Sequence, residues 1–285
     1  MNKGKKFFKQ SWKIIILLLV IAMMLDISYK NKLLKIETYH IKLDKIPIAF
    51  DGYRILQLSD LHNYRFGQNQ IKLLKEIIEL KPDIIVFTGD LVERRYMSNN
   101  NGIMLLEKLA KNYPVYFVSG NHEEALEEAE LIKLKSSLIN AGVVVLDNEW
   151  RIIEKGHEAI LIVGLRDAVQ TRWDEYGAII EDCILDAGVD VFTVVLAHRP
   201  EFVKEYAETG IDLVLSGHTH GMQMGVEIPK WGIKFSPAKL RYKRWAGLYS
   251  SNNNYLYINR GFGFLGFPGR VGTYPEITLL NLERA

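Results

Sequence analysis

The sequence contains very little cysteine, because Cys183 is the only one in 285 residues. A single thiol cannot form an intrachain disulfide, and a zinc site built from several thiolates is excluded as well. Proline is also sparse, with 8 residues, whereas 48% of the residues are hydrophobic and 25% are charged. This composition excludes a disordered chain and a disulfide-stabilised miniprotein, and it suits a domain with one large core. Any metal ion must therefore be held by His, Asp, Asn or Glu.

The chain also lacks a strong net charge, and its positive charge lies at one end. The formal net charge is +2, but residues 1–37 carry a net +6 and the other 248 residues a net −4. Nucleic-acid binding depends on a broad basic surface that neutralises many phosphates. The mildly acidic body therefore argues against nucleic acid as a partner.

Long apolar runs are absent except near the N-terminus, where Ile14–Leu25 are apolar without a break. These twelve residues are fewer than the ~20 that span a bilayer, but the span extends over Trp12–Tyr29 if Lys13 and Asp26 reach the two interfaces. A cleaved signal peptide has the same basic start and short apolar run. Because no small-x-small cleavage site follows Leu25, we expect an uncleaved signal anchor.

The lysines around this run predict its orientation and the division of the chain. Five Lys precede the run and three follow it, which favours an N-terminus inside the cell and an extracytoplasmic body attached to the cell membrane by one pass. We expect a basic cytoplasmic tail (1–13), a membrane anchor (14–29), a linker with a first strand (30–46) and one folded domain (47–285). So short a linker keeps the body close to the membrane.

Short apolar runs then alternate with stretches whose apolar residues recur at a spacing of three and four, a pattern typical of parallel strands connected by helices. The runs predict buried strands over Arg54–Leu58, Asp83–Thr88, Val115–Val118, Val191–Ala197 and Asp212–Leu215. The spaced stretches predict helices over Ile71–Leu80, Ile103–Ala110, Glu123–Asn140 and Glu201–Glu208. We expect an outer strand over Ile36–Leu43. The strand-rich last third, at 246–250, 255–258 and 276–282, predicts a second and more antiparallel sheet packed on the first.

Polar residues follow each of the five buried strands at once, and five of the seven His residues are among them. The positions are Asp60 and His62, Asp90, Asn121 to Glu123, His198, and His218 with His220. The carboxyl ends of parallel strands form the ligand crevice of an open sheet, so these side chains are expected to converge. We expect His40 and His157, which lie elsewhere, to be satisfied core residues.

A cluster of nitrogen and oxygen donors suits Mn, Fe, Zn or Co. The cluster offers more donors than one ion uses once positions are left for water and substrate, which indicates two divalent ions. In a two-metal centre a carboxylate such as Asp90 can bridge the ions, and the pair can promote in-line phosphoryl displacement.

The motifs D-x-H (60–62), G-D (89–90), G-N-H-E (120–123), a later His198 and G-H-T-H (217–220) together resemble the calcineurin-like metallophosphoesterases, in that family's order. The resemblance implies a four-layer αββα sandwich with two metal ions. It implies one ion on Asp60, His62, Asp90 and His220, and the other on Asp90, Asn121, His198 and His218. It also implies that His122 stabilises the transition state or protonates the leaving group.

Two further features fit the membrane-anchored branch of that family. The run GHTHGMQ (217–223) and Pro275-Glu276 accompany the N-terminal anchor, and some members of this branch are similar to pyrophosphatases of UDP-diacylglucosamine. Glu93 sits where many members place an acid that orients the catalytic His, although a solvated loop glutamate fits the sequence equally well. Substrate does not follow from fold, because it is read by segments outside the metal motifs.

The segment 228–275 holds eight Lys or Arg, eleven aromatic residues and no acid. One interpretation is that basic residues such as Arg260 and Arg270 bind phosphate or anionic headgroups. In the same interpretation the apolar stretch GFGFLGFPG meets acyl chains through Phe262, Phe264, Leu265 and Phe267. The alternative is a solvated basic face beside a Gly-rich turn with core phenylalanines.

We therefore expect a membrane-anchored two-metal phosphohydrolase that cleaves a phosphodiester or pyrophosphate, with a lipid-linked substrate as one candidate and membrane lipid as a partner. The alternatives are a phosphomonoesterase of the same family and a non-catalytic, membrane-tethered metal-binding protein.

Overall fold

The structure of the chain is a computed structural model. It describes residues 3–93, 100–167, 175–202, 206, 209–223, 226–228, 233–235, 244–251, 254–263 and 269–285.

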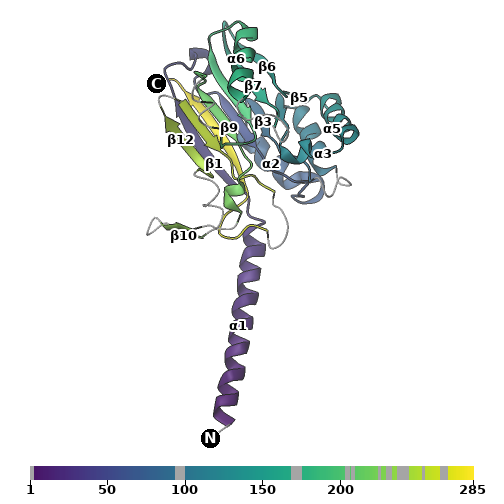
Figure 1. Ribbon diagram of the computed structural model, residues 1–285, viewed down its shortest axis with the longest axis vertical. Coiled ribbons are helices and arrows are strands. Elements are labelled where there is room, and N and C mark those ends of the chain that lie inside the picture. The colour runs from purple at the N-terminus through teal and green to yellow at the C-terminus, as the bar shows by residue number, and fades with distance from the viewer. Residues whose placement is uncertain are drawn as a thin grey trace.

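Six strands form the first sheet, in the order β1-β14-β2-β3-β4-β5 (Figure 1). Their bounds are Lys35–Lys42 (β1), Glu276–Glu283 (β14), Arg54–Leu58 (β2), Ile84–Thr88 (β3), Val115–Val118 (β4) and Val144–Val145 (β5). Strands β2 to β5 are parallel, whereas β14 runs antiparallel to β2 and parallel to β1. The carboxyl ends of β2, β3 and β4 therefore lie at one edge of this sheet.

Six other strands form the second sheet, in the order β12-β13-β9-β8-β7-β6. Their bounds are Gly247–Ser251 (β12), Asn254–Ile258 (β13), Leu213–Ser216 (β9), Phe192–Ala197 (β8), Glu158–Leu165 (β7) and Glu149–Lys155 (β6). The four inner strands are parallel, and the edge strands β12 and β6 are antiparallel to their neighbours. A separate antiparallel hairpin joins β10 (Val226–Ile228) to β11 (Ile233–Phe235).

Helices cover the outer face of each sheet, which gives four layers and confirms the predicted αββα sandwich. They are α2 (Ile71–Leu80), α3 (Asn101–Ala110), α4 (Asn121–Glu124), α5 (Glu128–Asn140) and α6 (Tyr176–Ala187). Alternate residues of a strand point to opposite faces. In β3, Ile85 and Phe87 pack with α2, α3 and α5, while Ile84 and Val86 pack between the two sheets. Helix α6 packs on the far face of the second sheet with β7 and β8.

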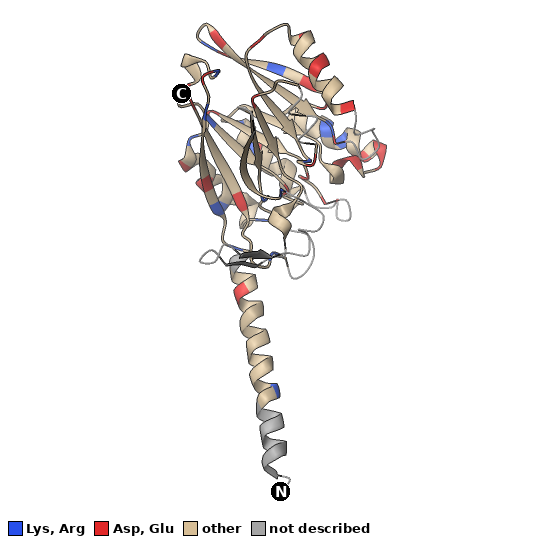
Figure 2. Ribbon diagram, turned by 60° about the vertical axis from the view of Figure 1, so that its left-hand side comes forward, with Lys and Arg blue, Asp and Glu red and all other residues tan. Residues whose placement is uncertain are grey.

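A long helix, α1 (Lys3–Lys30), projects from the body, and Figure 2 shows few charged residues along its described part. Its stretch Trp12–Tyr29 has a mean hydropathy of 2.1 and is 6% buried. By length and composition this helix can cross a membrane, although a signal sequence has the same properties. Figure 1 places β10 beside the junction between α1 and the body.

The sheet prediction was wrong in two respects. The five buried strands were expected in one sheet, but β8 and β9 belong to the second sheet. The last strand was expected in the second sheet, but β14 lies in the first, between β1 and β2. Buried strands of either sheet are equally apolar, so their composition does not say which sheet they join.

The helix prediction differs at three places. The helix expected over 123–140 is two helices, because the chain at Glu127 is extended between α4 and α5. Residues 201 and 202 form a turn and Tyr206 is helical, while 203–205, 207 and 208 lie outside the described residues. The β6–β7 pair and α6 were not predicted.

Candidate metal centre

Loops from both sheets converge on one buried cluster. Asp60 and His62 follow β2, Asp90 follows β3, and His122 lies in α4 directly after β4. From the second sheet, His198 follows β8, and His218 and His220 follow β9. Thus the prediction that strand ends meet holds, although the strands come from two facing sheets.

Four side chains form what we call the first donor group: Asp60, His62, Asp90 and His220. One ligand atom from each lies within 4.8 Å of those of the others, and all four residues are buried. The His220 Nε2 atom is 3.1 Å from His62 Nε2 and 3.4 Å from Asp60 Oδ1. The His62 Nε2 atom is 3.7 Å from Asp90 Oδ2. These distances allow a single ion to be shared by the group.

The second donor group consists of Asp90, Asn121, His198 and His218. His198 Nε2 lies 3.3 Å from Asp90 Oδ2, 3.1 Å from Asn121 Oδ1 and 3.2 Å from His218 Nδ1. The other ring nitrogen, Nδ1, lies 2.8 Å from the Thr88 carbonyl oxygen and donates to it, so that in the neutral form of the ring the lone pair of Nε2 faces the group. Asp90 Oδ2 faces both donor groups, as a bridging ligand would.

The protonation of the histidines also suits cations. Burial lowers the pKa of His62 to about 3 and that of His220 well below its ordinary value, so both rings are neutral near pH 7. At most one proton can lie between their facing Nε2 atoms, so the two rings share at most one hydrogen bond there. Burial alone would lower the pKa of His198, but Asp90 and Asp60 raise it to about 10, which marks a position that favours positive charge. The donor set therefore fits Mn, Fe, Zn or Co.

The two carboxyl groups of the centre differ in their environments. Burial raises the pKa of Asp60 to about 6, and the nearby Asp90 carboxylate contributes to the increase. For Asp90 burial acts in the same direction, but the charge and hydrogen bond of His198 hold its pKa well below the ordinary value. Asp90 is therefore the ionised anchor of the cluster.

Backbone strain concentrates at the donor positions. The φ angles of Asp60, His62, Asp90, His218 and His220 lie between 49° and 69°, a region that non-glycine residues rarely occupy. Hydrogen bonds hold two of these turns, from the Asp60 N–H to the Gly89 oxygen (2.9 Å) and from the His62 N–H to the Asp90 oxygen (3.0 Å). At Gly217 a Cβ atom would lie 1.9 Å from Ser59 Oγ, so the β9 loop can approach β2 only with glycine there.

Glu123 holds the backbone around Asp90 in place, a role that the sequence analysis missed. Its carboxylate accepts hydrogen bonds from the N–H groups of Asp90 (2.8 Å), Val92 (3.0 Å) and Gly120 (2.8 Å). Burial raises its pKa to about 8, and the three N–H donors oppose that shift. The three converging donors stabilise the carboxylate form and hold the side chain against the Asp90 loop. Its position in G-N-H-E was the signal available in the sequence.

His122 and Glu93 lie at the edge of the first donor group. The His122 N–H donates to Asp90 Oδ1 (2.9 Å), and the ring Nδ1 is 3.4 Å from Glu93 Oε2. Glu93 Oε2 is also 3.6 Å from His62 Nδ1, and the Glu93 side chain is 12% exposed. Glu93 thus lies beside the rings of both His62 and His122 and is largely buried.

A buried pair beside the second donor group was also missed. Arg199 donates from Nε to Asp167 Oδ2 (2.8 Å), and its NH1 lies 3.2 Å from His218 Nε2. The Asp167 side chain is fully buried. Nothing in the local sequence around Asp167 singles it out, because it is brought to Arg199 from the end of β7.

The structure corrects the prediction that Phe262 meets acyl chains. Phe262 is fully buried in the core beneath the first sheet, with its ring centroid 5.8 Å from that of Phe66 and 6.1 Å from that of Phe87. Arg260 is paired with Glu276. The Arg270 guanidinium is fully buried and bonded to backbone carbonyls. Phe264, Leu265 and Phe267 lie outside the described residues.

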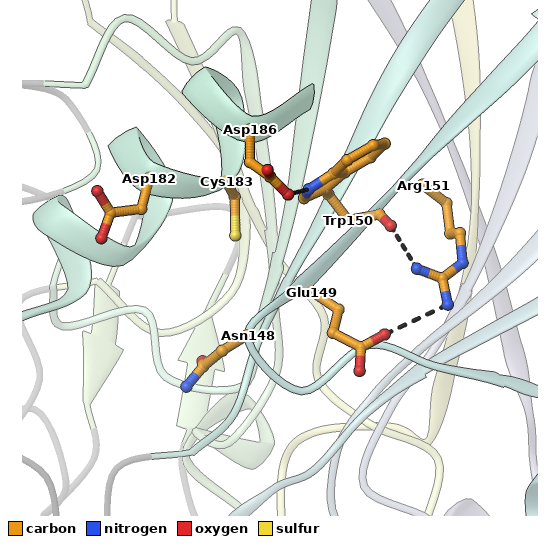
Figure 3. A pocket seen from close by; sticks show the side chains of 7 residues that line it. All are labelled: Asn148, Glu149, Trp150, Arg151, Asp182, Cys183 and Asp186. Atoms are coloured by element: carbon orange, nitrogen blue, oxygen red, sulfur yellow. Dashed lines mark hydrogen bonds and ion pairs between the residues drawn. The ribbon is translucent and has the colours of Figure 1, made fainter. Parts of the chain in front are cut away.

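A cleft between β6 and α6 lies apart from these donors (Figure 3). Its lining includes Glu149, Asp182, Cys183 and Asp186. The Trp150 indole donates to Asp186 Oδ2 (3.0 Å), and Arg151 donates to Glu149 (3.3 Å). No residue of either donor group lines this cleft.

Comparison with known proteins identifies relatives of the chain. Residues 53–222 match the family described as calcineurin-like phosphoesterase. The metallophosphoesterase YkoQ of Bacillus subtilis is 31% identical over 271 residues, covering 93% of this chain and 97% of the relative. Phosphodiesterase YaeI of Escherichia coli is 30% identical, and the match covers 81% of this chain and 82% of the relative. A transmembrane protein with a metallophosphoesterase domain from Danio rerio is 28% identical, covering 88% of this chain and 58% of its own.

Proposed function

Because the chain belongs to the calcineurin-like phosphoesterase family and is a metal-dependent phosphoesterase, we propose that it hydrolyses a phosphodiester or pyrophosphate bond at a two-metal centre. The observation that carries the proposal is the position of Asp90 Oδ2, 3.7 Å from His62 Nε2 and 3.3 Å from His198 Nε2. One carboxylate oxygen shared by two donor groups is the arrangement that two neighbouring ions require.

The first donor group would hold one ion and the second donor group the other. Bound ions of this kind act as Lewis acids and lower the pKa of water, which supplies a nucleophile at neutral pH. The protein's own contribution is to fix donor positions. Glu123 holds the Asp90 loop through backbone N–H groups, and the Thr88 carbonyl sets the tautomer of His198.

His122 would act on the reacting phosphoryl group without holding metal. Its ring is 12% exposed, so it is reachable by substrate, and Glu93 can accept the proton on its Nδ1 atom. An imidazole held in this way can donate a proton to a leaving oxygen or stabilise charge on the phosphoryl group.

We further propose that α1 anchors the enzyme in the cell membrane with its body outside the cytoplasm, and that the substrate is lipid-linked. The apolar stretch Trp12–Tyr29 and the likeness to a transmembrane metallophosphoesterase support the anchor. The lysine distribution supports the orientation, with five before the run and three after it. The short tether between α1 and β1 supports a substrate at the membrane surface.

The rival within the family is a phosphomonoesterase. The name of YaeI, a phosphodiesterase 30% identical to this chain, favours the diester. Full-length protein in detergent micelles with Mn²⁺ should hydrolyse bis-p-nitrophenyl phosphate faster than p-nitrophenyl phosphate. Preference for the monoester would support the rival. Stable binding of Mn²⁺ with turnover of neither compound would support a binding protein.

The substrate class needs a separate screen. The same preparation should be offered a nucleotide-linked diacylglucosamine, a polyprenyl pyrophosphate, a phospholipid and a nucleotide sugar without a lipid chain. We expect cleavage of a lipid-linked compound with a kcat/KM well above that of the soluble one. An advantage for the soluble compound would contradict the lipid assignment.

A further inference from the structure

Near the end of the apolar helix, one buried polar residue, Asn31, is hydrogen-bonded to the body. Asn31 follows α1 and is 5% exposed, and its backbone N–H donates to the Ile27 oxygen (3.0 Å), so it continues the helical turn. Ile27, one turn earlier, is 6% exposed, whereas the rest of the stretch is almost entirely open. Asn31 and Ile27 are therefore two points at which this end of α1 packs against the body.

Asn31 is paired with the backbone of Arg270, a residue 239 positions away. Its Oδ1 accepts the Arg270 N–H (2.7 Å), and its Nδ2 donates to the Arg270 oxygen (3.3 Å). The preceding Gly269 has a φ of +84°, and a Cβ atom there would lie 2.9 Å from Asn31 Nδ2. Because Nδ2 also donates to the Ile27 oxygen (2.9 Å), the Asn31 amide links the last turn of the apolar helix to one residue of a distant loop.

The Arg270 side chain leads from that loop into the candidate metal centre. Its guanidinium donates to the carbonyl oxygens of His220 (2.9 Å), Gly261 (3.0 Å) and Gly263 (2.6 and 3.0 Å). Among the described residues no carboxylate lies within ion-pairing distance of it. An arginine that is fully buried and bonded only to backbone carbonyls holds loops together and is not free to meet substrate.

The carbonyls that Arg270 holds belong to segments in contact with Asp60. The Gly263 N–H donates to the Asp60 oxygen (2.8 Å), and a Cβ atom on Gly261 would lie 2.6 Å from Asp60 Cβ. His220 is itself a member of the first donor group. Through these hydrogen bonds Arg270 fixes the positions of Asp60 and His220 relative to each other. Asn31 in turn fixes the backbone of Arg270.

We propose that Asn31 and Arg270 are positioning residues for the first donor group, so that the end of the apolar helix forms a structural part of the metal centre. The proposal rests on the proposed two-metal function. It predicts that changes at the end of α1 alter the affinity of one ion and leave the other ion unaffected, since the second donor group makes no bond to Arg270. Residues that orient metal ligands typically contribute about 10–100-fold to metal affinity.

The test uses full-length protein in detergent micelles, stripped of metal and titrated with Mn²⁺ while free Mn²⁺ is followed by electron paramagnetic resonance. Asn31→Ala should weaken one of two binding steps by roughly tenfold, and Arg270→Lys, which keeps the charge but not the three-carbonyl geometry, by at least as much. The affected step is identified as the one that disappears in His62→Ala. Lys32→Ala, an exposed neighbour, is the matched control and should bind Mn²⁺ as the wild type does.

Activity and stability separate positioning from general damage. In Asn31→Ala, kcat should be low at limiting Mn²⁺ and recover at saturating Mn²⁺, while KM for bis-p-nitrophenyl phosphate stays near that of the wild type. Unchanged Mn²⁺ affinities, or an equal weakening of both steps together with a lower Tm, would overturn the positioning role. Failure of the wild-type protein to bind Mn²⁺ would instead refute the proposed function on which this role depends.

Discussion

Replacement of His122 by Ala is expected to separate catalysis from metal binding. In the structure the His122 Nδ1 atom lies 3.4 Å from Glu93 Oε2, and the ring belongs to neither the first nor the second donor group. Its backbone N–H, which contacts Asp90 Oδ1, is kept in the variant. The protein should therefore retain both ions.

The expected loss follows from the role of a positioned acid. Such groups contribute ~10²–10⁴-fold, which corresponds to about 3–5 kcal/mol of transition-state stabilisation. The loss should be greater for an alkyl phosphodiester than for bis-p-nitrophenyl phosphate, because p-nitrophenolate leaves without needing a proton. Glu93→Gln, which keeps a hydrogen-bond acceptor beside the ring, should lower kcat by a smaller factor.

The assay combines steady-state kinetics on both substrates with metal content by mass spectrometry. A structural alternative exists, since His62, Glu93 and His122 also lie close enough together to hold an ion. Loss of one metal equivalent in His122→Ala would refute the division of roles and favour that alternative. Equal losses of kcat on the two substrates would refute proton donation by His122. The remaining role would be stabilisation of charge on the phosphoryl group.

Three other predictions address the bridge, the core and the anchor. Asp90→Asn should lose at least one metal equivalent, since an amide replaces the carboxylate that faces both donor groups; full metal content by mass spectrometry would contradict the bridging position. Phe262→Ala should cost about 3–5 kcal/mol of stability and lower Tm by roughly 6–20 °C, because it opens a cavity in the core; a Tm within 2 °C of the wild type in roughly matched buffer would contradict the burial. With reporters fused after Ala285, a periplasm-active reporter should work and a cytoplasm-active one should not; the reverse pattern would place the body inside.

Much of the fold was predictable because local patterns dominate there. The apolar runs of β2, β3 and β4 and the 3.6-residue period of α2 place those elements at nearly the predicted residues. Assignment to sheets was not predictable, because β8 and β9 are as apolar as β2. The break between α4 and α5 at Glu127 was not visible in the apolar spacing, and the inward turn of Glu123 depends on backbone N–H groups of the distant Asp90 loop.

The candidate site was also predictable only where local sequence determines it. The residue types that follow each strand predicted which side chains converge, although the strands that bring them together belong to two facing sheets. The surroundings of Arg270 could not be predicted, because its burial depends on carbonyls from two separate loops and on Asn31 at the end of α1. Basic composition alone indicated an exposed residue, whereas the structure buries the guanidinium completely.

The most direct test of the two-metal account is stoichiometric reconstitution. Metal-free full-length protein would be titrated with Mn²⁺ while hydrolysis of bis-p-nitrophenyl phosphate and bound metal are measured together. Because Asp90 faces two donor groups, we predict negligible turnover without metal and a plateau of activity at two Mn²⁺ per chain. Turnover that survives chelation, or a plateau at one Mn²⁺ per chain, would contradict the two-metal centre.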